Sequence, residues 1–285
     1  MSPLSPSVRA CLWMGGAILS FSAMAIAVRE LLRSMGIFEV LFLRTFVALL
    51  IIAAIVLRAG AGKLRTQRFG IHLARNLAHY GGQWCWVFAI GALPLATVFA
   101  IEFTMPVWTA ILAWLFLKER FTVPRVVMLV LGLAGVLLIV RPGGDNFNLA
   151  ALAMVVGSLC YASSFIFTKR LTSTDSALAI LFWMAVIQTP VSLALALPGW
   201  VPPVAADVPW ILAVGAGAFT AHYCMTRSMM LVDATVAVPI DFIRLPLIAL
   251  IGAAFYGEAL DPMVFVGAAI IFAGTYYSIS REARR

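Results

Sequence analysis

The stretch Ile101-Glu102-Phe103-Thr104-Met105-Pro106 recurs as Ile240-Asp241-Phe242-Ile243-Arg244-Leu245-Pro246. The acid and the phenylalanine of the two copies are each 139 residues apart (102 to 241, 103 to 242). Glu119 with Glu258 and Gly135 with Gly274 keep the same separation. Each copy lies in an apolar run long enough to cross a bilayer. The copies are separated by five predicted crossings, an odd number, so the second copy is inverted. Inverted repeats of membrane helices build carriers whose solute site lies at the repeat interface.

The composition places almost the whole chain in a membrane. Hydrophobic residues make up 63% of the 285 and charged residues 11%, against about 25% charged in a soluble domain. The mean hydropathy is +1.03. We therefore expect no water-facing domain, and the first apolar run shows no cleavage site of a leader. The four cysteines stand singly, without the spacing of a zinc site or a disulfide framework, so we expect neither a metal nor a cofactor.

Ten apolar runs are candidates for membrane-spanning helices. They cover residues 10–28, 38–57, 72–90, 94–117, 124–140, 149–168, 177–197, 209–227, 235–256 and 262–280. The sequence thus predicts an all-α integral membrane protein of ten helices around a central cavity. Two five-helix repeats, residues 1–145 and an inverted repeat of residues 146–285, would make up the chain.

Lysine and arginine are distributed unequally between the two sides of this arrangement. One set of alternate connections and chain ends holds fourteen of them, and the other set holds only Arg29, Arg33 and Arg141. Positive residues favour the cytoplasmic side, so both termini should be cytoplasmic. The net charge of +8 then reports topology, and nucleic acid is not an expected partner, because the positive residues form short clusters at helix ends.

Ionisable side chains inside membrane spans are costly and mark either a functional site or a buried pair. Counting residues from the helix ends places Glu102 in the outer half and its counterpart Asp241 in the inner half of the membrane. Arg44 could meet Glu102 in a structural ion pair, and Asp241 with Arg244 could pair along one helix. His79 and His222 are candidates for the cavity wall or for ordinary buried histidines. Histidine could also carry a coupling proton, but the sequence does not show coupling.

Prolines and aromatic residues suggest how the cavity moves and what it binds. Pro106 and Pro246 fall near the middle of matching spans, where a kink would allow bending. Aromatic side chains gather around the third span, and those that face inward would favour an apolar group on the solute; packing or lipid contact is the alternative for each. The cavity candidates in addition to His79 and His222 are Tyr80, Gln83, Trp84, Phe103, Trp108, Tyr161, Phe165, Trp183 and Tyr223.

These landmarks together resemble the drug/metabolite transporter superfamily in its ten-helix, two-repeat EamA-type branch. The resemblance rests on Arg44, Leu93-Pro94-Leu95-Ala96-Thr97, Pro106, Leu117-Lys118-Glu119-Arg120, the stretch from Asp241 to Pro246, Gly257-Glu258, Gly267 and Gly274, and covers nearly the whole chain. The second half departs from the first by carrying Met184 where Arg44 would recur. Members of this superfamily include bacterial exporters of amino acids, which implies the bacterial inner membrane.

The resemblance implies a secondary carrier that works by alternating access, and we expect it to export small amphipathic metabolites, foremost amino acids with apolar or aromatic side chains. A carrier of another metabolite, vitamin-like or nucleoside-like and working in uptake, is the main alternative. An intramembrane lipid enzyme is a lesser one, because the sequence has no H-E-x-x-H or G-x-S-x-G motif. The expected partners are a small-molecule substrate and membrane lipid. The sequence leaves monomer and homodimer equally open.

Overall fold

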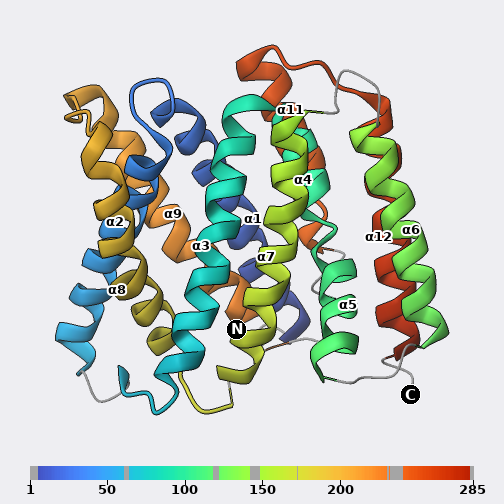
Figure 1. The fold of residues 1–285 in the computed structure, drawn as a ribbon, viewed down its shortest axis with the longest axis horizontal. Coiled ribbons are helices and arrows are strands. Elements are labelled where there is room, and N and C mark those ends of the chain that lie inside the picture. The colour runs from blue at the N-terminus through green and yellow to red at the C-terminus, as the bar shows by residue number, and fades with distance from the viewer. Residues whose placement is uncertain are drawn as a thin grey trace, which may run out of the picture.

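The computed structural model describes residues 6–60, 64–117, 122–141, 148–171, 173–229, 231 and 240–282. This part of the chain is helical and contains no strand. Its α-helices are α1 (Pro6–Leu31), α2 (Ile37–Ala59), α3 (Phe69–Ala92), α4 (Leu95–Glu102), α5 (Met105–Leu117), α6 (Val123–Val140), α7 (Leu149–Leu171), α8 (Ala177–Ala196), α9 (Val208–Met229), α11 (Arg244–Tyr256) and α12 (Pro262–Glu282). They stand side by side in one bundle (Figure 1).

The all-α membrane architecture is confirmed, but the count of ten spans is not reproduced in full. Eight stretches of the described residues are long and apolar enough to cross a membrane, α4 and α5 counting as one. Of the two remaining predicted spans, α3 has 24 residues but carries a polar stripe that lowers its hydropathy. The other, predicted over residues 235–256, begins among residues outside the described part, and its described helix α11 has 13 residues.

Both copies of the repeated stretch interrupt their helix. Helix α4 ends at Glu102 and α5 begins at Met105, so the break lies at Phe103 and Thr104 rather than at Pro106. The backbone N–H of Thr104 donates to the carbonyl of Ile101 at 3.0 Å, and Ile243 donates to Ile240 in the same way at 3.1 Å. Each proline follows its break in the first turn of the next helix, where its missing N–H costs little.

Helices of the first half pack mainly on helices of the second. Helix α1 packs on α9, α3 on α7, α2 on α8, and α6 on α12. Figure 1 shows α6 and α12 together at one edge of the bundle. Suppose that α1, α2 and α3 of the first half correspond to α7, α8 and α9 of the second. Exchanging the two halves then replaces α1 by α7 and α9 by α3, so the α1–α9 contact becomes the α7–α3 contact. The pairing pattern therefore has the form that a two-fold axis between the halves requires.

Glycine contacts give the register of this exchange. A β-carbon on Gly135 of α6 would lie 2.6 Å from the carbonyl oxygen of Gly267 on α12. Moving both positions by 139 residues gives Gly274 and Met128, and a β-carbon on Gly274 would lie 3.3 Å from the Met128 Cα. Residue numbers rise along α6 as they fall along α12, so these two helices are antiparallel. The helix backbones approach closely here because glycine has no side chain.

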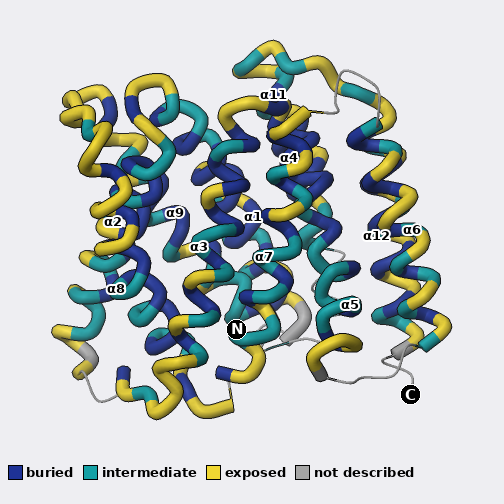
Figure 2. Tube along the Cα trace, in the orientation of Figure 1, coloured by how far each residue is buried: buried dark blue, intermediate teal, exposed yellow. Residues whose placement is uncertain are grey.

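Burial divides the bundle into a core and a perimeter. The main core cluster takes side chains from both halves, including Phe99 on α4 and Ile248 on α11. Figure 2 shows exposed positions along the outer sides of the peripheral helices and at the loops. Large apolar residues such as Leu57, Phe116 and Phe255 are among the exposed ones. An apolar perimeter of this extent is what contact with lipid tails requires.

Candidate functional site

Helix α3 presents a polar stripe to the interior of the bundle. Apart from one adjacent pair, its buried polar side chains follow at steps of three or four residues, which places them on one face of the helix. They are His72, Arg75, Asn76, His79 and Gln83. The opposite face of α3 carries the exposed Leu73, Leu77 and Trp84. Polar side chains inside a membrane protein face the bundle interior or a water-filled space, so this stripe is the best starting point for a site.

His79 is the centre of a cluster built from four helices. Its ring lies 5.7 Å from the ring of His222 on α9 and 5.5 Å from Tyr161 on α7. The side-chain amide nitrogens of Gln83 and of Gln188 on α8 lie 2.8 and 3.2 Å from its Nδ1. An imidazole nitrogen makes one hydrogen bond, so the two amides compete for Nδ1. The predicted site residues His79, Gln83, Tyr161 and His222 therefore come together.

Two buried arginines adjoin this cluster. Arg44 on α2 is 4% exposed and Arg75 on α3 is 5% exposed. Arg75 donates to the Thr168 hydroxyl at 3.2 Å and to Asn76 Oδ1 at 3.0 Å. The charge of Arg44 acts on Arg75, His79 and His222. The positive side chains thus gather at the histidine cluster.

A second polar group occupies the two helix breaks. Arg244 is 4% exposed, and its Nη2 lies 3.0 Å from Asp241 Oδ2 and 3.4 Å from Glu102 Oε1. The indole N–H of Trp86 donates to the other oxygen of Glu102 at 2.8 Å. The predicted pairing of Asp241 with Arg244 is therefore confirmed. Among the residues that the structure describes, the expected partner of Glu102, Arg44, makes no ion pair with it.

Glu102 and Asp241 lie close together where the two halves meet. Both contact the same nitrogen of Arg244, and both helices break directly beside them. Their placement in the outer and inner halves of the membrane stays a prediction, because neighbouring residues of an inverted repeat can lie on either side of the midplane.

Phenylalanine rings surround this ion-paired group. Phe103 and Phe242, the two members of the repeat, stack on each other with ring centroids 4.1 Å apart. The Arg244 guanidinium lies 4.6 Å from the Phe21 ring, 5.0 Å from Phe99 and 5.1 Å from Phe103. Phe103 is therefore packed between the halves and beneath a cation, a position that favours a structural over a solute-contacting role.

The remaining predicted aromatics divide between the interior and the perimeter. Trp84 lies on the lipid-facing side of α3 and stacks on Phe88 at 5.7 Å, and Tyr223 contacts Trp13 at 5.9 Å on the side of α9 that carries the exposed Leu212. Neither belongs to the cluster, because helical spacing turns both away from it. Tyr80 is half-buried beside the core.

Three more aromatics lie at distinct places. Trp183 donates its indole N–H to the Leu64 carbonyl at 3.1 Å, at the end of the bundle near His72. Trp108 donates to the Thr104 hydroxyl at 3.1 Å and so braces the first break. Phe165 is 36% exposed and follows Tyr161 on α7 by four residues, about one helical turn. It stays a candidate for the cavity wall, whereas Trp108 and Trp183 contact other parts of the bundle.

One end of the bundle is fastened by an ionic clasp, which we define as Arg29, Glu258 and the backbone of Leu93 and Leu95. The Glu258 carboxylate pairs with Arg29 at 2.5 Å and accepts the Leu95 N–H, the start of α4, at 2.8 Å. Arg29 also donates to the Leu93 carbonyl. Gly257 makes this possible, because its left-handed conformation (φ 64°) turns the chain at the end of α11. The clasp therefore joins α1, α4 and α11.

The opposite end holds a second buried polar contact. His72 Nε2 lies 2.6 Å from Asp175 Oδ2, across the ends of α3 and α7. Burial raises the pKa of Asp175, but hydrogen bonds from His72, Thr66 and Thr174 outweigh it and leave the pKa below its usual value. The contact therefore holds these helix ends together with an ionised carboxylate.

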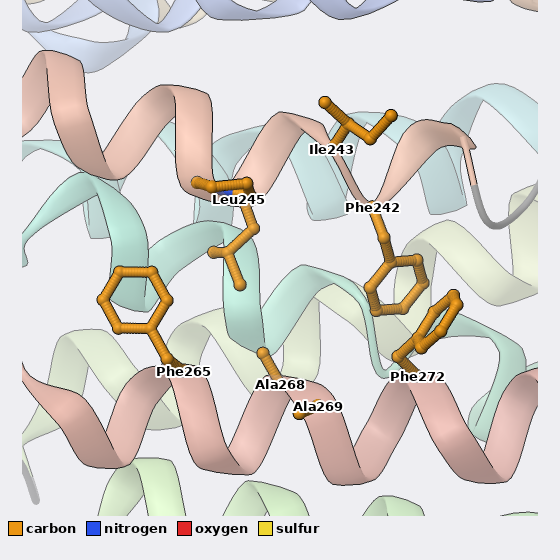
Figure 3. A pocket seen from close by; sticks show the side chains of 8 residues that line it. Phe242, Ile243, Leu245, Phe265, Ala268, Ala269 and Phe272 are labelled. Atoms are coloured by element: carbon orange, nitrogen blue, oxygen red, sulfur yellow. The ribbon is translucent and has the colours of Figure 1, made fainter.

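A cleft of about 320 Å³ opens between α11 and α12. Figure 3 shows its lining, with Phe242 and Phe272 facing each other at one end and Leu245 and Phe265 at the other. The rings of Phe242 and Phe272 are 4.8 Å apart. Its lining side chains are apolar, so it offers no group to orient a polar metabolite.

Comparison with known proteins identifies the family. The EamA-like transporter family matches residues 8–141 and 148–280. The chain belongs to this family. A solved crystal structure aligns over 96% of this chain and 98% of its own length with a TM-score of 0.68, and its 19% identity supports the fold alone.

Curated relatives span nearly the whole chain. An S-adenosylmethionine uptake transporter of Rickettsia conorii is 28% identical over 95% of this chain and 92% of its own. A riboflavin transporter of Rhizobium johnstonii is 30% identical over 99% and 94%. A pseudopaline exporter of Pseudomonas aeruginosa is 25% identical over 90% of each chain. The family and these names indicate a multi-pass membrane transporter of small metabolites and not an enzyme. They do not support the expectation of amino-acid export.

Sequence reasoning missed Arg75, His72, Gln188 and Asp175. Arg75 and His72 lie in the first turn of the predicted span 72–90, where charged residues are ordinary. The spacing of Arg75, His79 and Gln83 along one helix face could have identified the polar stripe of α3.

Proposed function

We propose that this protein is a secondary carrier for the uptake of a vitamin-like or nucleoside-like metabolite. The observation that carries the proposal is the similarity, over nearly the whole chain, to transporters named for riboflavin and for S-adenosylmethionine uptake. Riboflavin and S-adenosylmethionine each join a flat nitrogen heterocycle to a hydroxyl-bearing chain or sugar. The proposed substrate shares that chemistry.

The His79 cluster suits such a substrate. The rings of His79, Tyr161 and His222 offer flat surfaces, and Gln83 and Gln188 bring amide groups to the same cluster. Few polar groups among aromatic walls are the usual lining of a metabolite site. We place the heterocycle against these rings and include Phe165 in the wall. Trp84, Trp183 and Tyr223 are not part of the proposed site.

Alternating access would follow from the two halves, residues 1–145 and 146–285, acting as inverted repeats. The antiparallel α6–α12 contact with its 139-residue register supports this arrangement. The breaks before Pro106 and Pro246 are the proposed hinges, because each lacks regular helix hydrogen bonding. The clasp would close one end of the path. The lysine and arginine distribution supports cytoplasmic termini, which places the clasp on the outer side, and the bacterial relatives support the bacterial inner membrane.

Export of a metabolite is the second candidate, favoured by the similarity to a protein named a pseudopaline exporter. Proteoliposomes containing the protein test the two directly. We expect labelled riboflavin or S-adenosylmethionine to enter these vesicles faster than vesicles without the protein. Labelled tryptophan should enter both kinds of vesicle at the same rate. Movement of tryptophan without either heterocycle would overturn the proposal and restore the amino-acid reading.

A further inference from the structure

The buried arginines of the bundle differ in how their charge is balanced. Arg244 contacts two carboxylates, and the partly buried Arg29 contacts one. Arg75 contacts only a hydroxyl and an amide oxygen. Arg44 makes no hydrogen bond or ion pair with any residue in the described part of the chain. Arg44 and Arg75 therefore form an unbalanced pair of positive charges inside the protein.

An unbalanced buried charge is expensive, and two close together are more so. Moving a lone cation out of water costs far more than a neutral side chain of the same size. An anion from outside the protein would balance both charges.

The neighbouring amides add a second feature that points to a ligand. Gln83 is 2% exposed and Gln188 is 1% exposed, and the Oε1 atom of each is buried without a hydrogen-bond partner. Buried polar atoms in proteins almost always find a partner. The two amide oxygens can accept hydrogen bonds from N–H groups of a ligand. The two guanidinium groups beside them can donate hydrogen bonds to an anionic group of the same ligand. A metabolite carrying both would satisfy the site.

We propose that Arg44 and Arg75 bind an anionic group, a carboxylate or a phosphate, of the transported metabolite, while Gln83 and Gln188 accept its N–H groups. This inference rests on the proposed function and names the feature by which the carrier selects its substrate. Guanidinium groups suit it because they present several N–H donors to carboxylate or phosphate oxygens. The flat ring then lies on the His79 side, and the anion lies toward α2.

Pairs of ligands that differ in one anionic group test the inference. The pairs are riboflavin 5′-phosphate with riboflavin, S-adenosylmethionine with its methyl ester, and tryptophan with tryptophan amide. Binding is measured by titration calorimetry on the full chain in nanodiscs. In any pair that binds, the member with the extra negative charge should bind about ten to a hundred times more tightly, the effect of a hydrogen-bonded charge. Equal binding within every pair that binds would overturn the inference.

Variants then assign the effect to the arginines. Arg44→Gln and Arg75→Gln should each reduce the preference for the anionic member at least about tenfold. The matched control is Arg58→Gln on the same helix as Arg44, because Arg58 is exposed; it should keep the preference. Unchanged preference in both Arg44→Gln and Arg75→Gln would overturn the inference. If a glutamine variant fails to fold, Arg44→Lys, which keeps the charge, should bind the anion more weakly yet still prefer it.

Thermal stability separates a binding arginine from a structural one. Removing an unbalanced buried cation should leave the apparent melting temperature of ligand-free Arg44→Gln unchanged or higher. A structural arginine would lower it. A lower melting temperature together with an intact anion preference would overturn the inference.

The ligand panel also keeps this inference distinct from the proposed function. If only the tryptophan pair binds and the acid is preferred, the vitamin-like or nucleoside-like substrate is wrong but the anion site stands. If riboflavin and its phosphate bind equally, the substrate class stands and the anion site is wrong.

Discussion

Neutralising Glu258 should loosen the clasp that closes one end of the bundle. Glu258→Gln keeps the shape of the side chain, and its amide oxygen can still accept the Leu95 N–H. It loses the charge that pairs with Arg29 at 2.5 Å, where the two side chains are 12% and 17% exposed. A charge-assisted contact of this burial contributes about 1–2 kcal/mol after allowance for solvent screening. The ratio of molecules in which this end is open to molecules in which it is closed should therefore rise roughly five- to thirtyfold.

Cysteine labelling measures this opening. A single reporter cysteine replaces Ala96 on α4, which is 9% exposed and lies just below the clasp, in a chain whose four native cysteines are replaced by alanine. The rate of modification by a membrane-impermeant maleimide should rise by the same factor in Glu258→Gln. The control is Asp261→Asn at the same end, whose bridge to Arg141 joins two more exposed side chains; it should leave the rate unchanged. Equal rates in the two variants would refute the reasoning.

Three further predictions concern stability. Arg244→Gln leaves two close carboxylates without their cation and should destabilise the fold by about 3–5 kcal/mol, seen as a lower apparent melting temperature; no change would contradict the ion-paired centre. Gly135→Ala forces α6 from α12 and should cost about 1–3 kcal/mol, whereas Gly15→Ala, where a β-carbon meets nothing within 4 Å, should cost nothing; equal effects would contradict the helix contact. The lowered pKa of Asp175 means its stabilisation is complete above the unfolded pKa of about 4 and is lost as pH falls through the folded value. The stability difference between wild type and Asp175→Asn should thus shrink below about pH 4, and a difference independent of pH would contradict it.

The sequence was sufficient for the broad architecture because bilayer physics constrains it strongly. Apolar runs, the 139-residue repeat and the charged loops predicted a helical membrane bundle, and the family match agrees. The repeated glycines Gly135 and Gly274 both lie at the contact between α6 and α12. The repeat can be recognised from the sequence because the same close helix contact, which requires glycine, occurs in both halves.

Partners across the bundle were harder to predict. Glu102 was expected to meet Arg44 and instead meets Arg244, since helix depth alone does not say which face a residue occupies. The breaks were expected at Pro106 and Pro246. They lie two to four residues earlier because a proline removes the hydrogen bond to the residue four positions before it. Arg75 escaped notice because a charged residue near a predicted helix end resembles an interfacial one.

Exchange across a membrane tests the central claim most directly. Vesicles containing the protein are loaded with unlabelled riboflavin or S-adenosylmethionine, and entry of the same labelled compound is followed. A carrier whose single site faces each side in turn should take up label faster into loaded vesicles than into empty ones. Entry at the same rate with and without internal substrate, or no entry of either compound, would contradict the account.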